Sequence, residues 1–205
     1  MEVVLATNVA LLHEQVLEDL QPRLALKNLE IISYMGKKLP SWMACKQGYL
    51  KCLTEIKLVN LRKCERLPPL GQLPGLETVE ISGMESISAV DDAFYGDGGT
   101  FRWLQSLIFS EMPMLERWLM AKGWQNLEGV RELEISGCEE LRCLPPGIMF
   151  LEFLRRLEII RCNNLTSLPE LTSLDWSEKV RVPIDLVVQD CAMLSFIPER
   201  LKQSP

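Results

Sequence analysis

The sequence has 205 residues, of which 47% are hydrophobic and 24% charged, and this balance disfavours disorder and fibrous folds. The formal net charge of −6 and the pI near 5.0 argue against a nucleic-acid partner, because protein surfaces that bind the anionic phosphates of nucleic acids are basic. No stretch approaches the roughly 20 apolar residues that cross a bilayer, so we expect no membrane segment.

Residues 8–20 predict a helix near the N-terminus. Asn8 is available as its N-cap, and Pro22 follows its end. One face of the helix would carry the apolar residues Val9, Leu12, Val16 and Leu20. We therefore interpret residues 1–25 as an N-terminal helix that leads into the rest of the chain. The acidic Glu2 and the short apolar run before Thr7 do not fit a secretory signal peptide.

From residue 26 onward one phrase recurs, apolar-x-x-Leu-x-Ile-x-x-Cys-x-x-Leu-x-x-Leu-Pro. It is clearest over 130–145 and 154–169, which match position for position. The first residue of each Leu-x-Ile pair falls at 29, 56, 79, 107, 133, 157 and 186, at intervals of 27, 23, 28, 26, 24 and 29 residues. Such a phrase and period are typical of leucine-rich repeats. Residues 26–205 are therefore predicted to form a leucine-rich-repeat domain of about seven irregular repeats.

The repeat implies an α/β solenoid. Each Leu-x-Ile pair predicts a short strand whose alternate side chains point inward, and neighbouring repeats must stack to bury them. We expect an arc with a parallel β-sheet on the concave face and loops or short helices on the convex face. The column of Cys138, Cys162 and Cys191 should be mostly buried and make weak hydrogen bonds to the next backbone turn.

Three looser stretches, 91–100, 120–126 and 174–183, predict loop insertions between repeats. Four tryptophans follow repeats near their turns and are expected to close the convex core: Trp42, Trp118, Trp124 and Trp176. Little at either end of the chain would cap the array, which indicates a piece of a longer one.

Seven cysteines without paired spacing favour a reducing, cytoplasmic location over a disulfide scaffold. They also lack the paired spacing of a zinc site, and histidine is represented by His13 alone. A catalytic set would have to use His13, on the predicted helix, where packing or solvation is the simpler interpretation. We therefore expect neither a metal site nor an enzyme.

The concave face is the usual binding surface of a solenoid. Its middle column reads Glu30, Lys57, Glu80, Ile108, Glu134, Glu158 and Val187. Together with flanking charges, the candidate partner surface consists of Glu30, Glu55, Lys57, Glu80, Glu132, Glu134, Arg156 and Glu158. This acidic stripe, with a patch of Arg155, Arg156 and Arg161 beside it, favours a basic or mixed-charge protein partner, and the alternative is a merely solvated sheet face.

The sequence Cys-Glu-Arg-Leu-Pro-Pro-Leu-Gly-Gln-Leu-Pro-Gly-Leu at 64–76 is more specific than a generic repeat. It resembles the repeat region of plant intracellular disease-resistance proteins, the nucleotide-binding leucine-rich-repeat receptors of the coiled-coil class. Four further stretches agree in the family's order: 16–22, 39–43, 93–97 and 109–118. The resemblance implies a protein-interaction module that recognises pathogen effectors or host proteins and regulates a nucleotide-switch domain in defence.

The nucleotide switch itself is absent from this sequence. No Gly-x-x-x-x-Gly-Lys-Ser/Thr phosphate loop occurs, so ATP or ADP binding is not carried over and no cofactor is expected. Two other functions stay open: an adaptor that recognises substrates of a ubiquitin ligase, although no F-box-like helical segment precedes the repeats, and a truncated receptor remnant that senses nothing.

Overall fold

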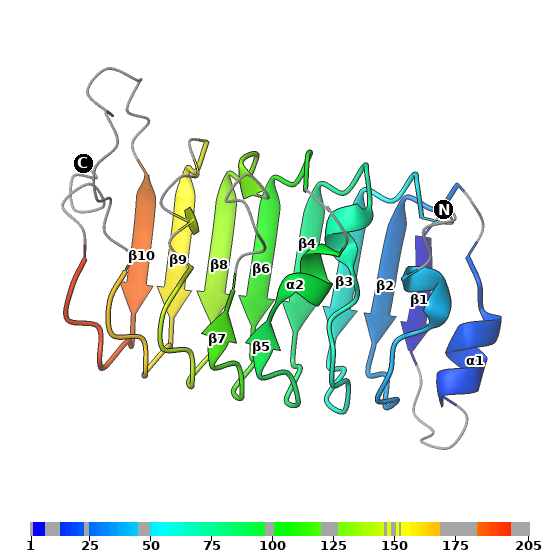
Figure 1. Ribbon diagram of the computed structural model, residues 1–205, viewed down its shortest axis with the longest axis horizontal. Helices are drawn as coiled ribbons and strands as arrows, with labels where there is room; N and C mark the ends of the chain where they lie inside the picture. The colour runs from blue at the N-terminus through cyan, green and yellow to red at the C-terminus, as the bar shows by residue number, and fades with distance from the viewer. Residues whose placement is uncertain are drawn as a thin grey trace.

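The computed structural model describes residues 2–6, 13–22, 25–44, 50–96, 101–119, 127–145, 147–148, 151, 153–168 and 184–197. Eight strands of this part lie side by side in one parallel sheet (Figure 1). In sheet order they are β1 (Glu2–Ala6), β2 (Asn28–Ile32), β3 (Glu55–Val59), β4 (Thr78–Ser82), β6 (Ser106–Ser110), β8 (Glu132–Ser136), β9 (Arg156–Ile160) and β10 (Asp185–Gln189). The predicted fold class, a leucine-rich-repeat solenoid with a parallel sheet, is confirmed, and each of the seven predicted anchors lies in one of the strands from β2 to β10.

The strands form because apolar residues alternate with polar ones. In β2, β3, β4 and β6 the second and fourth residues are buried, and the first, third and fifth are partly exposed. Leu29 and Ile31 of β2, for example, are each 1% exposed. Alternate side chains of a strand point to opposite faces, so the first, third and fifth residues of the strands make one continuous surface, which we call the sheet face.

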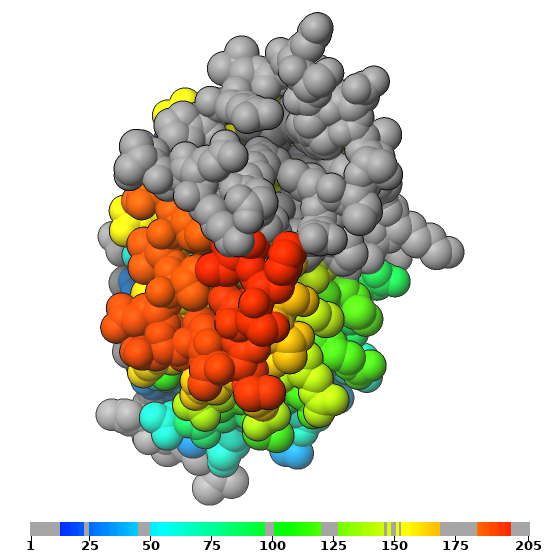
Figure 2. Space-filling model, turned by 90° about the vertical axis from the view of Figure 1, so that its left-hand side faces the viewer, coloured from blue at the N-terminus to red at the C-terminus, as the bar shows by residue number. Residues whose placement is uncertain are grey.

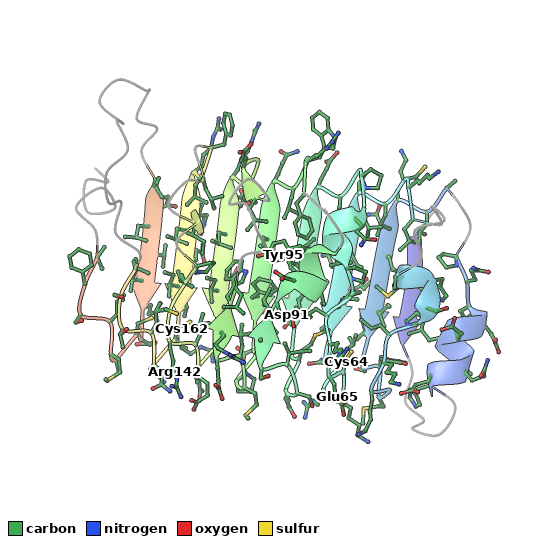
Figure 3. The ribbon with its side chains drawn as sticks, in the orientation of Figure 1. Cys64, Glu65, Asp91, Tyr95, Arg142 and Cys162 are labelled. Carbon is green, nitrogen blue, oxygen red and sulfur yellow. The ribbon has the colours of Figure 1, made fainter. Side chains whose placement is uncertain are left out.

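A column of small or flexible apolar residues lies where the chain leaves each strand. Cys138 and Cys162 of this column are fully buried. The Cys162 thiol, marked at the end of β9 in Figure 3, lies 3.6 Å from the carbonyl oxygens of Ile135 and Ile160. The predicted bond to the next backbone turn is therefore wrong, because the nearest carbonyls belong to the preceding strand and to the cysteine's own strand.

Short elements cover the other side of the sheet (Figure 1). They are the 3-10 turns η1 (Ser41–Met43) and η2 (Leu70–Gln72), helix α2 (Asp92–Tyr95) and the paired strands β5 (Ala89–Val90) and β7 (Arg117–Trp118). The stretch 91–100 was expected to be a loop, but its described part contains α2. Asp91 caps this helix by accepting from the Ala93 N–H at 3.0 Å, and the helix ends at Tyr95, with Gly96 as its C-cap at a φ of 72°. The predicted loops 120–126 and 174–183 lie outside the described residues.

An aromatic cluster fills the core beneath the convex elements. Phe94, Tyr95, Phe109 and Trp118 pack in edge-to-face or tilted pairs, with ring centroids 5.0 to 5.8 Å apart. The buried Trp118 indole N–H donates to the Tyr95 hydroxyl at 2.9 Å, which satisfies a polar group that burial would otherwise penalise (Figure 3 marks Tyr95). Trp118 and Trp42 are 2% and 3% exposed, so the predicted core role is confirmed for both. Trp124 and Trp176 lie outside the described residues.

Helix α1 (His13–Asp19) occupies part of the predicted helix, whose residues 8–12 lie outside the described part. The two members of its predicted apolar face that the structure describes, Val16 and Leu20, are exposed. Val16 is 37% exposed and Leu20 46%, whereas His13 and Leu17 are buried. The Leu17 carbonyl accepts from the Trp42 indole N–H at 2.9 Å, which joins the helix to η1.

Strand β1 adds a repeat ahead of those predicted. It pairs in parallel register with β2, from Glu2 opposite Asn28 to Ala6 opposite Ile32. The sheet therefore extends into residues 1–25, which the sequence had separated from the array. No helix in the described ranges is long and apolar enough to cross a membrane.

The core thins at the other end of the sheet. Figure 2 looks onto this end, where β10 and the turn after it are coloured orange and red. In β10 all three middle residues are only partly buried, in contrast to the alternation of the inner strands. Among the described strands β10 pairs on one side alone, so its inward side chains lack the second neighbour that buries those of β9.

Candidate protein-interaction face

The sheet face brings together the eight residues predicted to form a partner surface. Consecutive strands pair residue for residue, so Glu30 lies opposite Lys57, Lys57 opposite Glu80, and Glu134 opposite Glu158. The register also aligns the predicted middle column in full: Glu30, Lys57, Glu80, Ile108, Glu134, Glu158 and Val187. Six glutamates against one lysine and one arginine give the eight residues a net charge of −4.

Lys57 joins two of the glutamates at the N-terminal half of the face. Its ammonium lies 3.4 Å from a Glu80 carboxylate oxygen and 3.5 Å from one of Glu55. Glu55 also accepts from the Asn28 amide at 2.7 Å. The charge of Glu80 is the largest cause of a raised Lys57 pKa, so the lysine is a cation at every physiological pH.

Arg156 joins two carboxylates at the C-terminal half of the face. Its guanidinium pairs with Glu158 and lies 3.8 Å from an Asp185 carboxylate oxygen. The Glu158 side chain is 16% exposed, so it is the most enclosed of the paired carboxylates on this face. Glu134, directly opposite, accepts from the Ser136 hydroxyl at 2.9 Å. Two carboxylates on adjacent strands are thus held apart by separate partners.

The predicted arginine patch does not form. Arg156 begins β9 and Arg161 follows its end, so an extended chain places them about 16 Å apart. Arg161 instead pairs with Glu111, two strands away. Gly137 lies at the same position of the strand between them, and a Cβ there would stand 3.0 Å from the Glu111 carboxylate. The missing side chain leaves room for the ion pair to cross.

The sequence alternation predicted which residues share the face, but it missed the ion pairs. Asp185, which was not among the candidate residues, joins through Arg156 because β10 pairs with β9 at that position. Glu30 is half-buried and Glu132 exposed, and they complete the face. Lys57 pairs with carboxylates at the N-terminal half of the face and Arg156 at the C-terminal half, and the glutamates outnumber these two cations.

Two chemical alternatives to protein binding are a metal site and a catalytic site that uses His13. The described ranges contain no group of three His, Cys, Asp or Glu side chains that could hold a metal ion. Cys64, Cys138 and Cys162 are buried free thiols, and burial raises the pKa of Cys64. The histidine lies buried against Tyr34, with ring centroids 6.1 Å apart, far along the chain from the sheet-face carboxylates of β8 and β9.

The sequence is similar to part of several plant disease-resistance proteins. The family profile described as R13L1/DRL21 LRRs matches residues 6–84. Putative disease resistance protein RGA1 of Solanum bulbocastanum is 33% identical over 125 residues, which are 60% of this chain and 12% of that protein. Putative disease resistance RPP13-like protein 1 of Arabidopsis thaliana is 30% identical over 137 residues, 62% of this chain and 13% of that protein. Putative disease resistance protein RGA4 of Solanum bulbocastanum is 29% identical over 180 residues, and the match covers 76% of this chain and 18% of that protein.

The chain thus spans less than a fifth of the length of each of these relatives. Among solved structures, the leucine-rich-repeat domain of the type III effector XopL superposes with a TM-score of 0.56 over 87% of this chain and 71% of that one. The two sequences are 17% identical, so this likeness supports the fold alone.

Proposed function

We propose that this chain, a leucine-rich-repeat domain homologous to the repeat regions of plant disease-resistance proteins, is a protein-interaction module of a plant immune receptor. The observation that carries the proposal is the sheet face. It presents charged side chains of β2, β3, β4, β8 and β9, whose strands pair residue for residue in one parallel sheet, on a scaffold whose concave surface suits extended protein partners. The module acts by binding and not by catalysis.

Its partners are a pathogen effector or a host protein, together with the nucleotide-switch domain of the receptor. The homology supports this pair of roles, since the matched relatives are named as disease-resistance proteins. A cytoplasmic location is supported by free thiols at Cys52, Cys64, Cys138, Cys143, Cys162 and Cys191, which suit a reducing compartment.

The charge of the face specifies the kind of contact. With a net charge of −4 over the eight residues, the surface attracts a basic segment, whose cations can replace Lys57 and Arg156 as partners of Glu80 and Glu158. Exchange of one ion pair for another keeps every carboxylate satisfied. Such binding weakens as salt screens the exposed charges.

The test is co-expression of the full chain with the nucleotide-switch domain of a related resistance receptor, followed by titration calorimetry of the purified components. The variant Glu80→Gln/Glu134→Gln/Glu158→Gln removes three charges and keeps side-chain size. Reversal to lysine is less informative, because Lys57 and Arg156 would then face new cations. We expect the triple variant to bind at least about tenfold more weakly, or about 1.4 kcal/mol.

A matched control is Glu65→Gln/Glu85→Gln/Glu139→Gln, which changes net charge equally at exposed positions in the turns after strands. Glu65 and Glu85 form exposed ion pairs with Lys37 and Arg62, so the control also breaks two salt bridges. It should bind within about twofold of the parent, because exposed pairs contribute little. Equal losses in both variants, or no complex with the parent chain, would refute the sheet face as the binding site.

A further inference from the structure

Two aromatic side chains are exposed at the edge of the sheet where the strands begin. Trp103 is 64% exposed and Phe153 57%, the largest values among the exposed large hydrophobic side chains of the described ranges apart from Met193, which equals Phe153. Trp103 lies three residues before β6 begins at Ser106, and Phe153 three residues before β9 begins at Arg156. Both therefore occupy the same position of the repeat. Figure 3 shows ring-bearing side chains projecting from this edge.

The repeat between them leaves a gap. Sheet order places β8 between β6 and β9, and three residues before β8 stands Gly129. Two strand spacings separate the aromatic positions, about 10 Å. A Cβ on Gly129 would stand 3.0 Å from the Leu104 carbonyl oxygen, so the backbone there packs directly on the preceding turn. One apolar side chain of a partner can lie over Gly129 with a ring on either side.

Two arginines adjoin this gap on the side of the sheet. Arg131 and Arg155 immediately precede β8 and β9, and the Arg155 N–H donates to the Arg131 carbonyl at 2.8 Å. Both side chains are exposed, and neither forms an ion pair with any other residue that the structure describes. Arg156, by contrast, is engaged by Glu158 and Asp185. Glu128 and Glu132 are nearby along the chain, so this edge carries both charges, and the two arginines supply the cations of the site.

We propose that this aromatic rim, made of Trp103, Gly129, Arg131, Phe153 and Arg155, binds an acidic polypeptide segment that carries a large apolar side chain. Tryptophan and arginine are the residue types that contribute most at protein interfaces. A guanidinium binds a carboxylate through two parallel hydrogen bonds, and the rings enclose the apolar group. A nucleic acid fits less well, because its continuous phosphates would extend over the acidic sheet face beside the rim.

The rim and the sheet face are proposed as two different contacts, because the rim binds an acidic segment and the sheet face a basic one. It can be tested by fluorescence anisotropy of the full chain with a dye-labelled peptide of Asp and Glu around one central Phe. Three further probes vary one feature each: Gly in place of Phe, Lys in place of the acids, and a labelled single-stranded oligonucleotide. We expect the acidic Phe peptide to bind below about 1 mM and each of the others at least about tenfold more weakly.

Two variants locate the site on the chain. Trp103→Ala/Phe153→Ala should weaken binding of the acidic Phe peptide at least about tenfold, and Arg131→Gln/Arg155→Gln should do the same and lessen its salt dependence. These side chains are exposed, so thermal melts should be unchanged. The proposal is overturned if the acidic Phe peptide fails to bind, or if the lysine peptide or the oligonucleotide binds as well.

Matched controls use residues of the same kinds elsewhere. Met114→Ala/Leu119→Ala removes two apolar side chains that are 52% and 50% exposed, and Arg66→Gln/Arg142→Gln removes two exposed arginines. Both should bind the acidic Phe peptide within about twofold of the parent. Losses as large as those of the rim variants would instead show a general effect of surface charge or apolar area.

Discussion

In the eight-stranded sheet, the residue that follows each strand from β2 to β10 adopts a left-handed backbone. Positive φ, between 50° and 66°, occurs at Ser33, Asn60, Gly83, Glu111, Gly137, Arg161 and Asp190. The N–H of six of them donates to the last residue of the next strand, as from Asn60 to Ser82 at 2.8 Å. This conformation turns the chain out of the sheet at the same point in every repeat. Residues other than glycine adopt it at a cost of about 1–2 kcal/mol, which the repeated hydrogen bond helps to offset.

Gly83→Ala should therefore destabilise the domain by about 1–2 kcal/mol. The backbone there has φ of 66°, and an added Cβ would lie 3.1 Å from the Asn60 backbone nitrogen. Gly75→Ala is the matched control, since its φ is not positive and its Cβ would meet the Leu53 carbonyl oxygen at an ordinary 3.4 Å. Equilibrium urea unfolding measures both. If the two variants lose equal stability, the left-handed turn is not what requires glycine at 83.

The sequence did not predict these turns or the ion pairs of the sheet face. Alternation placed Glu80, Glu134 and Glu158 on one face correctly, because a strand has a period of two. It could not predict that Lys57 pairs with both Glu55 and Glu80, because a long side chain has several neighbours within reach on its own strand and on adjacent strands. Nor did it single out Trp103, whose significance depends on Phe153 two strands away.

At the scale of elements, α1 is held by hydrogen bonds to its glutamates as well as by the burial of Leu17. The Glu14 carboxylate accepts from the Lys37 N–H at 2.8 Å, and Glu18 accepts from the Ser41 N–H at 2.7 Å and from its hydroxyl. These bonds satisfy backbone groups of the turn that begins η1. The apolar periodicity over 8–20 placed Val16 and Leu20 on one face of the helix, but it could not reveal these hydrogen bonds.

The Glu18 contact predicts a dependence of α1 docking on pH. Hydrogen bonds from Ser41 lower the pKa of Glu18 below its ordinary 4.5. A folded-state pKa below the unfolded value means that the stabilisation is present above pH 4.5 and is lost as pH falls through the lower, folded value. We expect the Trp42 indole N–H resonance, which reports the bond to Leu17, to shift over that acidic range.

Glu18→Gln keeps side-chain size but removes the titrating group. The Trp42 resonance of this variant should lack the acidic transition, whereas Glu65→Gln, at an exposed ion pair elsewhere, should keep it. An unchanged transition in Glu18→Gln would assign the titration to another carboxylate.

For the whole molecule, the period of the repeat was enough to predict the fold. Seven Leu-x-Ile pairs gave seven strands in the right order, because each repeat can bury its core only against its neighbours. Strand β1 escaped detection since its residues, Glu-Val-Val-Leu-Ala, are not followed by the Leu-x-x-Leu spacing of the later repeats. Stacking makes stability a sum of neighbour contacts, so it should vary along the array.

The difference in burial between β9 and β10 allows the variation in stability along the array to be measured. Leu157 and Leu186 are register partners at the same repeat position, but Leu157 is 1% exposed while Leu186 is only partly buried. Leu157→Ala should cost about 2–5 kcal/mol, the range for a fully enclosed leucine. Leu186→Ala should cost less than half as much, because water already reaches its side chain and a truncation there leaves little cavity. Urea unfolding compares the two, and equal losses would mean that the core at β10 is as enclosed in solution as that at β9.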